Sequence, residues 1–410
     1  MRWTNSVAWA NVAVSTSGSS SAPSVGHELF SAEFLEGLRG EGDGPADRAV
    51  STFFDAVDAP GSALSSVMMR SSGASLDDEQ APGIGPFVQT LEPWPSWVDA
   101  ALVKRGQGLF GDWGMQLASG LFLASLPMSY ACAKGAEPLM RTARMTNSPK
   151  RRILETGQMI IDAMSPGSLV PGARGYVVTR RVRLMHAAVR HTLRDPKSVE
   201  SIGGATIPPW DDSLGVPINQ EDLLGTLLAF SVIGVKSLSQ VGVTLSDLDT
   251  EAYVHVWSLV GHQLGIRDDL LPLNFTDATV VADRIFKHQS APSEAGRELT
   301  ATTIAAMQDL LKMRFARGLA PSGIRFFLGE TTADLLGVPA SDWTRVFFTF
   351  MRHVDAPLER LLAWIPGQHS LSSAVGRRVV TALEDVERGH GRPQFEITDE
   401  LRQAWGIRTR

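Results

Sequence analysis

The sequence predicts an all-α protein that folds as a single large domain. Three observations favour this fold class. Apolar residues recur at helical spacing through several long segments, the alternating pattern of β-strands is almost absent, and no internal repeat divides the chain. The 410 residues, of which 43% are hydrophobic and 20% are charged, supply enough apolar material for one extended core.

Composition excludes several classes of protein. A net charge of −6 without a dominant basic segment argues against nucleic acid as a partner. The single cysteine, Cys132, excludes disulfides within the chain and any metal site built from several thiolates. Such sparing use of cysteine suits a reducing compartment, and we therefore expect a cytoplasmic protein.

The start of the chain is expected to be a disordered lead. One arginine, Arg2, precedes a short apolar patch and a Ser/Gly-rich run, which is a poor secretion signal. The longest uncharged run, Gly114 to Ala133, approaches membrane-spanning length, but its polar residues, glycines and proline favour a buried helix. Membrane association is therefore not expected. We predict a lead over 1–25, an all-α domain over 26–395 and a tail over 396–410.

Helices are expected along the whole domain. Short amphipathic helices are predicted from Gly26 to Met69. After a Gly/Pro/Ser-rich connection over 70–98, helical sequence runs from Asp99 to Pro127 with an interruption at Gly106–Gly114. The next helix has Ser148 as its N-cap and Pro149 as its first residue, and it ends near Met164. The helix that follows, which carries His186, is predicted to end near residue 195. Further helices are predicted over 220–240, 248–264, 294–314, 341–364 and 371–388.

One of these predicted helices carries the first candidate site. Its apolar residues recur at helical spacing and form one inward face: Val182, Met185, Val189 and Leu193. His186 lies on or beside this face, next to Ala187 and Ala188. Arg183 and Arg190 lie about one turn away on either side of it.

This arrangement leaves two interpretations open. A neutral imidazole among small apolar residues is what a haem iron needs on its proximal side, with the alanines leaving room for the macrocycle and the arginines meeting the propionates. The same pattern describes a core histidine whose ring is satisfied by a backbone carbonyl, and such histidines are more common.

A second candidate site lies on the preceding helix. Arg152, Glu155, Thr156 and Met159 share one face by their spacing, which predicts a polar pocket if that face is inward. An arginine can hold a developing anion and a carboxylate can move a proton. Gly157 costs the helix about 1 kcal/mol relative to alanine, so it marks a close approach by something flat or bulky. The alternative is an exposed ion pair.

Other motifs favour structural roles. His255 and His262 are two helical turns apart and could serve as metal ligands, although the residues around them are typical of a packed helix. Asp268 and Asp269 lack the second acidic cluster that a prenyl-diphosphate magnesium site requires. The aromatic run over 346–350 is expected to be core rather than a substrate channel.

Seven short segments between roughly residues 90 and 275 form a pattern by their order and spacing. They are Pro95-Ser96-Trp97-Val98-Asp99, Arg105-Gly106-Gln107, Leu126-Pro127 to Tyr130, Arg152-Ile153-Leu154-Glu155-Thr156, Arg183 to Arg190, Pro217-Ile218-Asn219-Gln220-Glu221-Asp222 and Trp257 to Gly265. Together they resemble the family of b-haem oxygenases that includes latex clearing proteins and the mpaB-type fungal oxygenase. The most specific pair is Arg-x-x-Glu-Thr followed by Arg-x-x-His-x-x-x-Arg.

The resemblance implies an all-α, globin-related core with additional helices around a haem b. It implies His186 as the axial ligand of the iron, with Arg183 and Arg190 as supporting arginines. The catalytic residues on the distal side would be Arg152, Glu155 and Thr156, with the Thr156 hydroxyl as a hydrogen-bond donor to oxygen. Known members cleave an isoprenoid double bond with dioxygen. We therefore expect a haem-dependent oxygenase that uses O₂, or a peroxide, on an apolar small molecule such as a prenyl or polyketide chain.

One position departs from the pattern of latex clearing proteins. Those proteins carry a lysine, which can ligate iron, where this chain has Glu155. The resemblance therefore implies five-coordinate or water-bound iron, with Glu155 as a proton shuttle, and places the chain nearer the mpaB-type branch. A second distal glutamate would fall near Glu137. Rubber is not expected as the substrate. The alternatives are a haem-binding sensor or carrier without turnover, and a cofactor-free scaffold in which His186 packs in the core.

Overall fold

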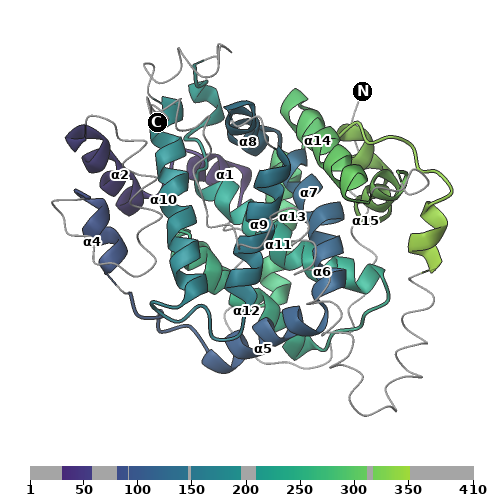
Figure 1. Ribbon diagram of the computed structural model, residues 1–410, viewed down its shortest axis with the longest axis horizontal. Helices are drawn as coiled ribbons and strands as arrows, with labels where there is room; N and C mark the ends of the chain where they lie inside the picture. The colour runs from purple at the N-terminus through teal and green to yellow at the C-terminus, as the bar shows by residue number, and fades with distance from the viewer. Residues whose placement is uncertain are drawn as a thin grey trace.

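Helix α11 (Gln220–Gln240) lies in the middle of the molecule, and the other helices pack around it (Figure 1). The computed structural model describes residues 30–57, 81–90, 92–145, 149–194, 209–311 and 317–350. Among these residues there is no strand, and an antiparallel bridge joins Cys132 to Ser290. The predicted all-α, single-domain fold is confirmed. The predicted boundaries after residues 25 and 395 lie outside the described residues.

The described helices follow one another along the chain in this order. In the first half they are α1 (Ala32–Leu38), α2 (Gly44–Ala56), α4 (Ile84–Gln89), α5 (Ala100–Asp112), α6 (Gly114–Gly120), the π-helix η1 (Leu121–Ser125), α7 (Leu126–Ala131), α8 (Ala133–Met145), α9 (Pro149–Met164) and α10 (Arg174–Arg194). In the second half they are η3 (Asp212–Leu214), α11, α12 (Asp247–Gln263), η4 (Asp268–Leu270), α13 (Phe275–Gln289), α14 (Glu294–Leu311) and α15 (Leu319–Leu335).

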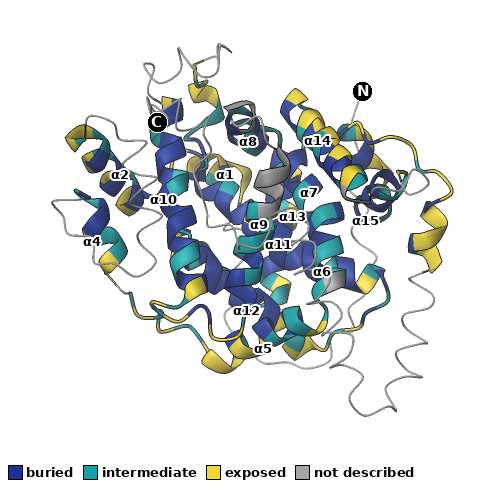
Figure 2. Ribbon diagram, viewed as in Figure 1, coloured by how far each residue is buried: buried dark blue, intermediate teal, exposed yellow. Residues whose placement is uncertain are grey.

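Helix α11 is buried because its sequence is apolar on nearly every side. Figure 2 shows it and the adjoining α12 mostly dark blue, in contrast to the exposed residues of the peripheral helices. Asn219 caps its start by accepting a hydrogen bond from the amide of Asp222 at 3.0 Å. Among the described helices, α11 has the length and composition to cross a membrane, and 78% of its most apolar window is buried inside the protein.

Helices α5 and α12 cross in close contact. Asp99 begins α5 by accepting hydrogen bonds from two amides of its first turn. The predicted interruption over Gly106–Gly114 is wrong at its first half, because α5 continues unbroken to Asp112. A Cβ added at Gly106 would lie 2.4 Å from the carbonyl oxygen of Ala252. This glycine therefore permits the close approach of α12 instead of ending the helix.

The predicted helices agree with the structure where caps and periodicity coincide. Helix α9 begins at Pro149 and ends at Met164, as predicted, and α10 ends at Arg194. The predictions omitted α13 and α15. Helix α15 contains Pro321 and Gly323 and has a kink at Gly329, where φ is +77°, so its sequence is typical of a loop. The helix predicted over 371–388 lies outside the described residues.

The aromatic run over 346–350, which was predicted to be core, is core at one of its residues, Phe348. A helix begins at residue 345, and of its apolar side chains Phe348 is buried against Phe326 and Phe327. Val346, Phe347 and Phe350 are exposed. The sequence pattern correctly predicted a helix with several apolar side chains here, but it cannot show whether another element of the fold covers those side chains.

Candidate functional site

Helices α9 and α10, which carry the two motifs identified in the sequence, pack against each other (Figure 1). Helix α10 lies between α9 on one side and α2 and α4 on the other. The fold therefore brings the Arg-x-x-Glu-Thr segment and the His186 segment onto neighbouring helices, as a two-sided pocket requires.

His186 is half-buried on the face of α10 that is turned away from α2. It lies one turn after Val182 and two turns before Leu193, both of which are buried. Ala187 and Ala188 lie on the other face and are fully buried in a cluster with apolar residues of α2 and α4. The prediction that these alanines leave room for a macrocycle is therefore wrong, because they leave room for α2 and α4.

The two arginines that flank His186 are paired with carboxylates of α2 and its N-cap. Arg183 donates two hydrogen bonds to Asp43, Nε to Oδ2 at 2.6 Å and Nη2 to Oδ1 at 2.9 Å. Arg190 donates from Nε to Asp47 Oδ1 at 2.7 Å and from Nη1 to the carbonyl of Ile218 at 3.0 Å. The sequence did not predict these pairs. A contact of either arginine with a haem propionate stays a prediction.

Both ion pairs favour the charged forms of their members, but burial opposes them with different outcomes for the pKa of Arg183 and of Asp47. Burial by itself lowers the pKa of the Arg183 guanidinium, but the bonds to Asp43 raise that pKa above its ordinary value. Burial raises the pKa of the Asp47 carboxyl, against the lowering effect of Arg190. Arg183 is therefore a firmly charged group inside the protein.

Helix α9 presents its polar motif beside the core. Glu155 and Thr156 are half-buried, and Met159 on the same face packs against the main hydrophobic cluster. Arg152 belongs to this helix, but its side chain lies outside the described residues. A Cβ added at Gly157 would meet no described atom within 4 Å, so the space beside this glycine is open. The proposed catalytic roles of these residues stay predictions.

The other candidate glutamate, Glu137 in α8, has a local partner. Its carboxylate lies 3.7 Å from Nε of Arg141, one turn along the same helix. The guanidinium of Arg141 in turn stacks on the ring of Trp210 at 5.0 Å. Whether Glu137 belongs to a distal pocket stays a prediction.

Sequence reasoning missed the loop between α1 and α2, residues 39–43, on which distant segments converge. Gln220 donates from Nε2 to the carbonyls of Gly42 at 2.9 Å and Gly265 at 3.0 Å. Arg39 bonds both Glu221 and Asp222 at the start of α11. The sequence signal at this loop, an Asp followed by Gly-Pro, indicates only a helix N-cap.

His255 and His262 both lie beside the segment that precedes α5. Both rings contact Trp97 edge to face, at centroid distances of 5.6 and 6.3 Å. His255 Nε2 accepts a hydrogen bond from the amide of Asp99 at 2.9 Å, and His262 Nδ1 lies 2.6 Å from a carboxylate oxygen of Asp268. In the described part of the chain, no three His, Cys, Asp or Glu side chains gather so as to hold a metal ion.

The buried ring of His255 predicts a loss of stability in acid. Burial lowers its pKa below the ordinary value of 6.5, against the effect of Asp99. As the pH falls, His255 therefore takes up a proton in the unfolded chain at a higher pH than in the folded protein, so the free energy of unfolding decreases below about pH 6.5. The decrease is roughly 1.4 kcal/mol for each pH unit over which only the unfolded state is protonated. In His255→Gln, whose amide oxygen can accept the same bond, we expect the melting temperature to fall less between pH 7 and pH 5. An equal fall in both proteins would contradict this assignment.

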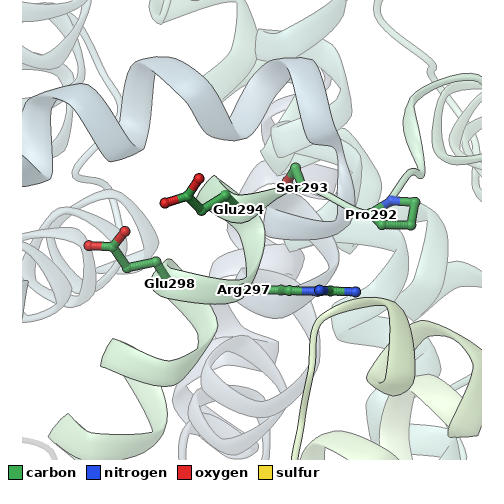
Figure 3. A pocket seen from close by; sticks show the side chains of 5 residues that line it. All are labelled: Pro292, Ser293, Glu294, Arg297 and Glu298. Carbon is green, nitrogen blue, oxygen red and sulfur yellow. The ribbon is translucent and has the colours of Figure 1, made fainter.

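Two pockets formed by described residues are not lined by the described residues of the two motifs. One, of about 470 Å³, opens at the start of α14, and Figure 3 shows Glu294 and Glu298 extending away from Arg297 there. Another, of about 400 Å³, lies between α2, α4 and Arg180. Neither is lined by His186, Glu155 or Thr156.

Comparison with known proteins identifies the family. Residues 108–356 match the family model described as "ER-bound oxygenase mpaB/B′/Rubber oxygenase, catalytic domain". The chain belongs to this family. The predicted resemblance is thus confirmed, and the matched region contains both α9 and α10.

A relative and a solved structure of the family agree with this assignment. The chain is 26% identical over 270 residues to a rubber oxygenase from Streptomyces sp. (strain K30), an alignment that covers 64% of this chain and 63% of the relative. It therefore spans less than two thirds of that protein's length. The fold is similar to that of latex clearing protein in the closed state, with a TM-score of 0.65 and 22% identity over 84% of this chain and 91% of the other.

The family resemblance implies a haem b, and α10 offers a suitable ligand for its iron in His186. His186 offers a ring nitrogen from a half-buried position on a rigid helix, which is how haem proteins commonly present an axial ligand. The alanines differ from the prediction, because Ala187 and Ala188 pack against α2 and α4. The role of Arg183 and Arg190 as supporting arginines of the haem stays a prediction.

Proposed function

We propose that this protein is a haem b-dependent oxygenase that uses O₂ to oxidise an apolar small molecule. The observation that carries the proposal is the packing of α9 on α10, which puts the Glu155–Thr156 motif on the helix next to His186. Membership of an oxygenase family supports it.

Each residue of the proposed site has a chemical role that suits its side chain. Haem, when bound, supplies the redox-active iron that activates dioxygen. His186 would hold the iron, and Thr156 can donate a hydrogen bond from its hydroxyl. Glu155 is half-buried, so its carboxylate can exchange protons with solvent and carry them to the pocket. Arg152 would hold developing negative charge.

The proposed reaction is oxidative cleavage of a carbon–carbon double bond. One alkene and one O₂ give two carbonyl compounds, so the atoms balance and no external reductant is needed. An apolar substrate such as a prenyl or polyketide chain is proposed, and the similarity to a rubber oxygenase supports an apolar chain as the class of substrate. We also propose that the protein works in the cytoplasm, in keeping with its single cysteine.

Absorption spectroscopy tests the cofactor. The purified protein is recorded as isolated, after addition of haemin, after dithionite and after CO. A Soret band that shifts on reduction and again with CO is expected for a histidine-ligated haem b. A spectrum that stays that of free haemin at every step would refute the proposal and favour a cofactor-free scaffold.

Turnover tests the enzyme against a haem-binding sensor or carrier. The haem-loaded protein is incubated with a prenyl alkene under O₂ or N₂, and carbonyl products are measured. Glu155→Ala should keep its haem but lower the rate by about 10²-fold, the size expected for loss of a proton-transfer group. Glu251→Ala, which removes an exposed glutamate of α12, is the control. An unchanged rate in Glu155→Ala would remove Glu155 from the mechanism, and absence of product in the parent protein would favour the sensor.

A further inference from the structure

The loop between α1 and α2 contributes a carboxylate to the helix that carries His186. This loop, residues 39–43, ends at Asp43, which also serves as the N-cap of α2. Both the loop and α2 lie outside the region, residues 108–356, that matches the oxygenase family. A contact from here to α10 is therefore not among the elements that define the family's catalytic domain.

The contact is a fully formed ion pair inside the protein. Both oxygens of Asp43 accept from Arg183, which is the two-bond geometry in which arginine binds carboxylates most specifically. The Asp43 side chain is 1% exposed and that of Arg183 is 10% exposed. The ring of Phe87 in α4 covers the guanidinium at 5.3 Å. Loss of the carboxylate would leave a buried cation without its counter-charge.

The chain reversal after α12 also touches this pair. Gly265 has a φ of +93°, and a Cβ there would lie 2.1 Å from Oδ2 of Asp43 and 2.7 Å from Nε of Arg183. Gln220, at the start of α11, joins the carbonyls of Gly42 and Gly265. The Asp43–Arg183 pair therefore lies where three parts of the fold meet: the loop 39–43, the start of α11 and the reversal after α12. Through this pair, α10 is fixed relative to all three.

We propose that Asp43 is a positioning residue for haem binding, which rests on the proposed function in that it takes His186 as the axial ligand. Arg183 lies one turn before His186 on the same helix. By fixing Arg183, Asp43 sets the position of that turn against α11 and α12, and so the direction from which the imidazole meets a bound group.

The second ion pair of α10 provides a matched comparison. Arg190 lies one turn after His186 and binds Asp47, which belongs to the same helix α2. The Asp47 side chain is 35% exposed and binds Arg190 through one oxygen, while its other oxygen accepts from the amide of Asp43 at 3.1 Å. The Asp43 side chain is enclosed and binds Arg183 through both oxygens. If enclosure and two-bond geometry determine the position of His186, Asp43 should matter much more than Asp47.

The test compares haemin release from the parent protein, Asp43→Asn and Asp47→Asn. Transfer of haemin to excess apomyoglobin is followed at a temperature at which circular dichroism shows all three proteins folded. Asp43→Asn should release haemin about 10-fold faster or more, the usual effect of losing a group that orients a metal ligand. Asp47→Asn should change the rate less than about twofold, because solvent reaches the Asp47 end of this pair and weakens it, and the asparagine amide oxygen can still accept the bond from the amide of Asp43.

A second readout separates positioning from general destabilisation. The iron–histidine stretching band of the reduced protein, measured by resonance Raman spectroscopy, should shift or broaden in Asp43→Asn and stay unchanged in Asp47→Asn. If Asp43→Asn does not fold, Arg183→Lys takes its place, since it keeps the charge but loses the two-bond geometry. An unchanged band and release rate in a folded variant would overturn the role of Asp43 while leaving the proposed function intact. Failure of the parent protein to bind haemin would overturn both.

Discussion

Replacing His186 by alanine is expected to abolish haem retention while leaving the helix content of the protein unchanged. Alanine is the best helix former, and α10 is held by contacts on its opposite face, where Ala187 and Ala188 pack against α2 and α4. Only the donor is lost. After loading with haemin and gel filtration, the ratio of Soret to protein absorbance should fall at least about tenfold, because the iron loses its protein ligand.

His191→Ala is the matched control for this experiment. His191 lies on the same helix and is also half-buried, but its ring packs against Phe54 of α2 at a centroid distance of 4.6 Å. This variant should retain haem. Full loading of His186→Ala would show that the ligand assignment is wrong, and equal loss in both variants would indicate damage to α10 instead of loss of a ligand.

Replacing Gly106 by alanine is expected to lower the free energy of unfolding by about 2–3 kcal/mol. The added methyl group would lie 2.4 Å from the carbonyl oxygen of Ala252 and 2.8 Å from Cγ1 of Val256. Two helix backbones cannot move apart at one point without disturbing the contact along their length, so α5 and α12 would separate or strain. Urea unfolding followed by circular dichroism measures the change, from the shift of the midpoint at constant slope.

Gly108, two residues after Gly106 on the same helix, gives the opposite expectation. A Cβ there would meet no described atom within 4 Å. Gly108→Ala should therefore raise the free energy of unfolding by about 0.5–1 kcal/mol, through helix propensity alone. If both variants shifted the midpoint in the same direction, the close approach of α5 to α12 would not be the reason for the glycine at 106.

The sequence predicted the long helices because local signals agreed with the fold. Pro149 at the start of α9 and the apolar α11 are examples in which capping or patterning fixes the element without tertiary information. Gly106 misled because a glycine that weakens a helix locally is retained where a neighbouring backbone needs the space. Helix α15 was missed for the same reason, since Pro321 and Gly323 suggest a loop until packing is known.

The candidate site was predicted in part. Helical spacing placed His186 on one face, and Glu155 with Thr156 on another, and the fold puts these faces on adjoining helices. Spacing does not reveal what covers the other faces. Arg183 and Arg190 pair with Asp43 and Asp47, which lie far away in the sequence. The sequence around these two aspartates indicates only the start of a helix, so no pattern within α10 could have identified them as partners.

The enclosure of α10 by α2 also bears on how much of the chain is needed for folding. The region that defines the family begins at residue 108, after α1, α2 and α4. A protein trimmed to that region would present the Ala187–Ala188 face of α10 to water and leave the Arg183 charge uncompensated. We therefore expect the smallest part of the chain that folds on its own to be larger than the segment by which the family is recognised, and to extend back at least to the loop that contains Asp43.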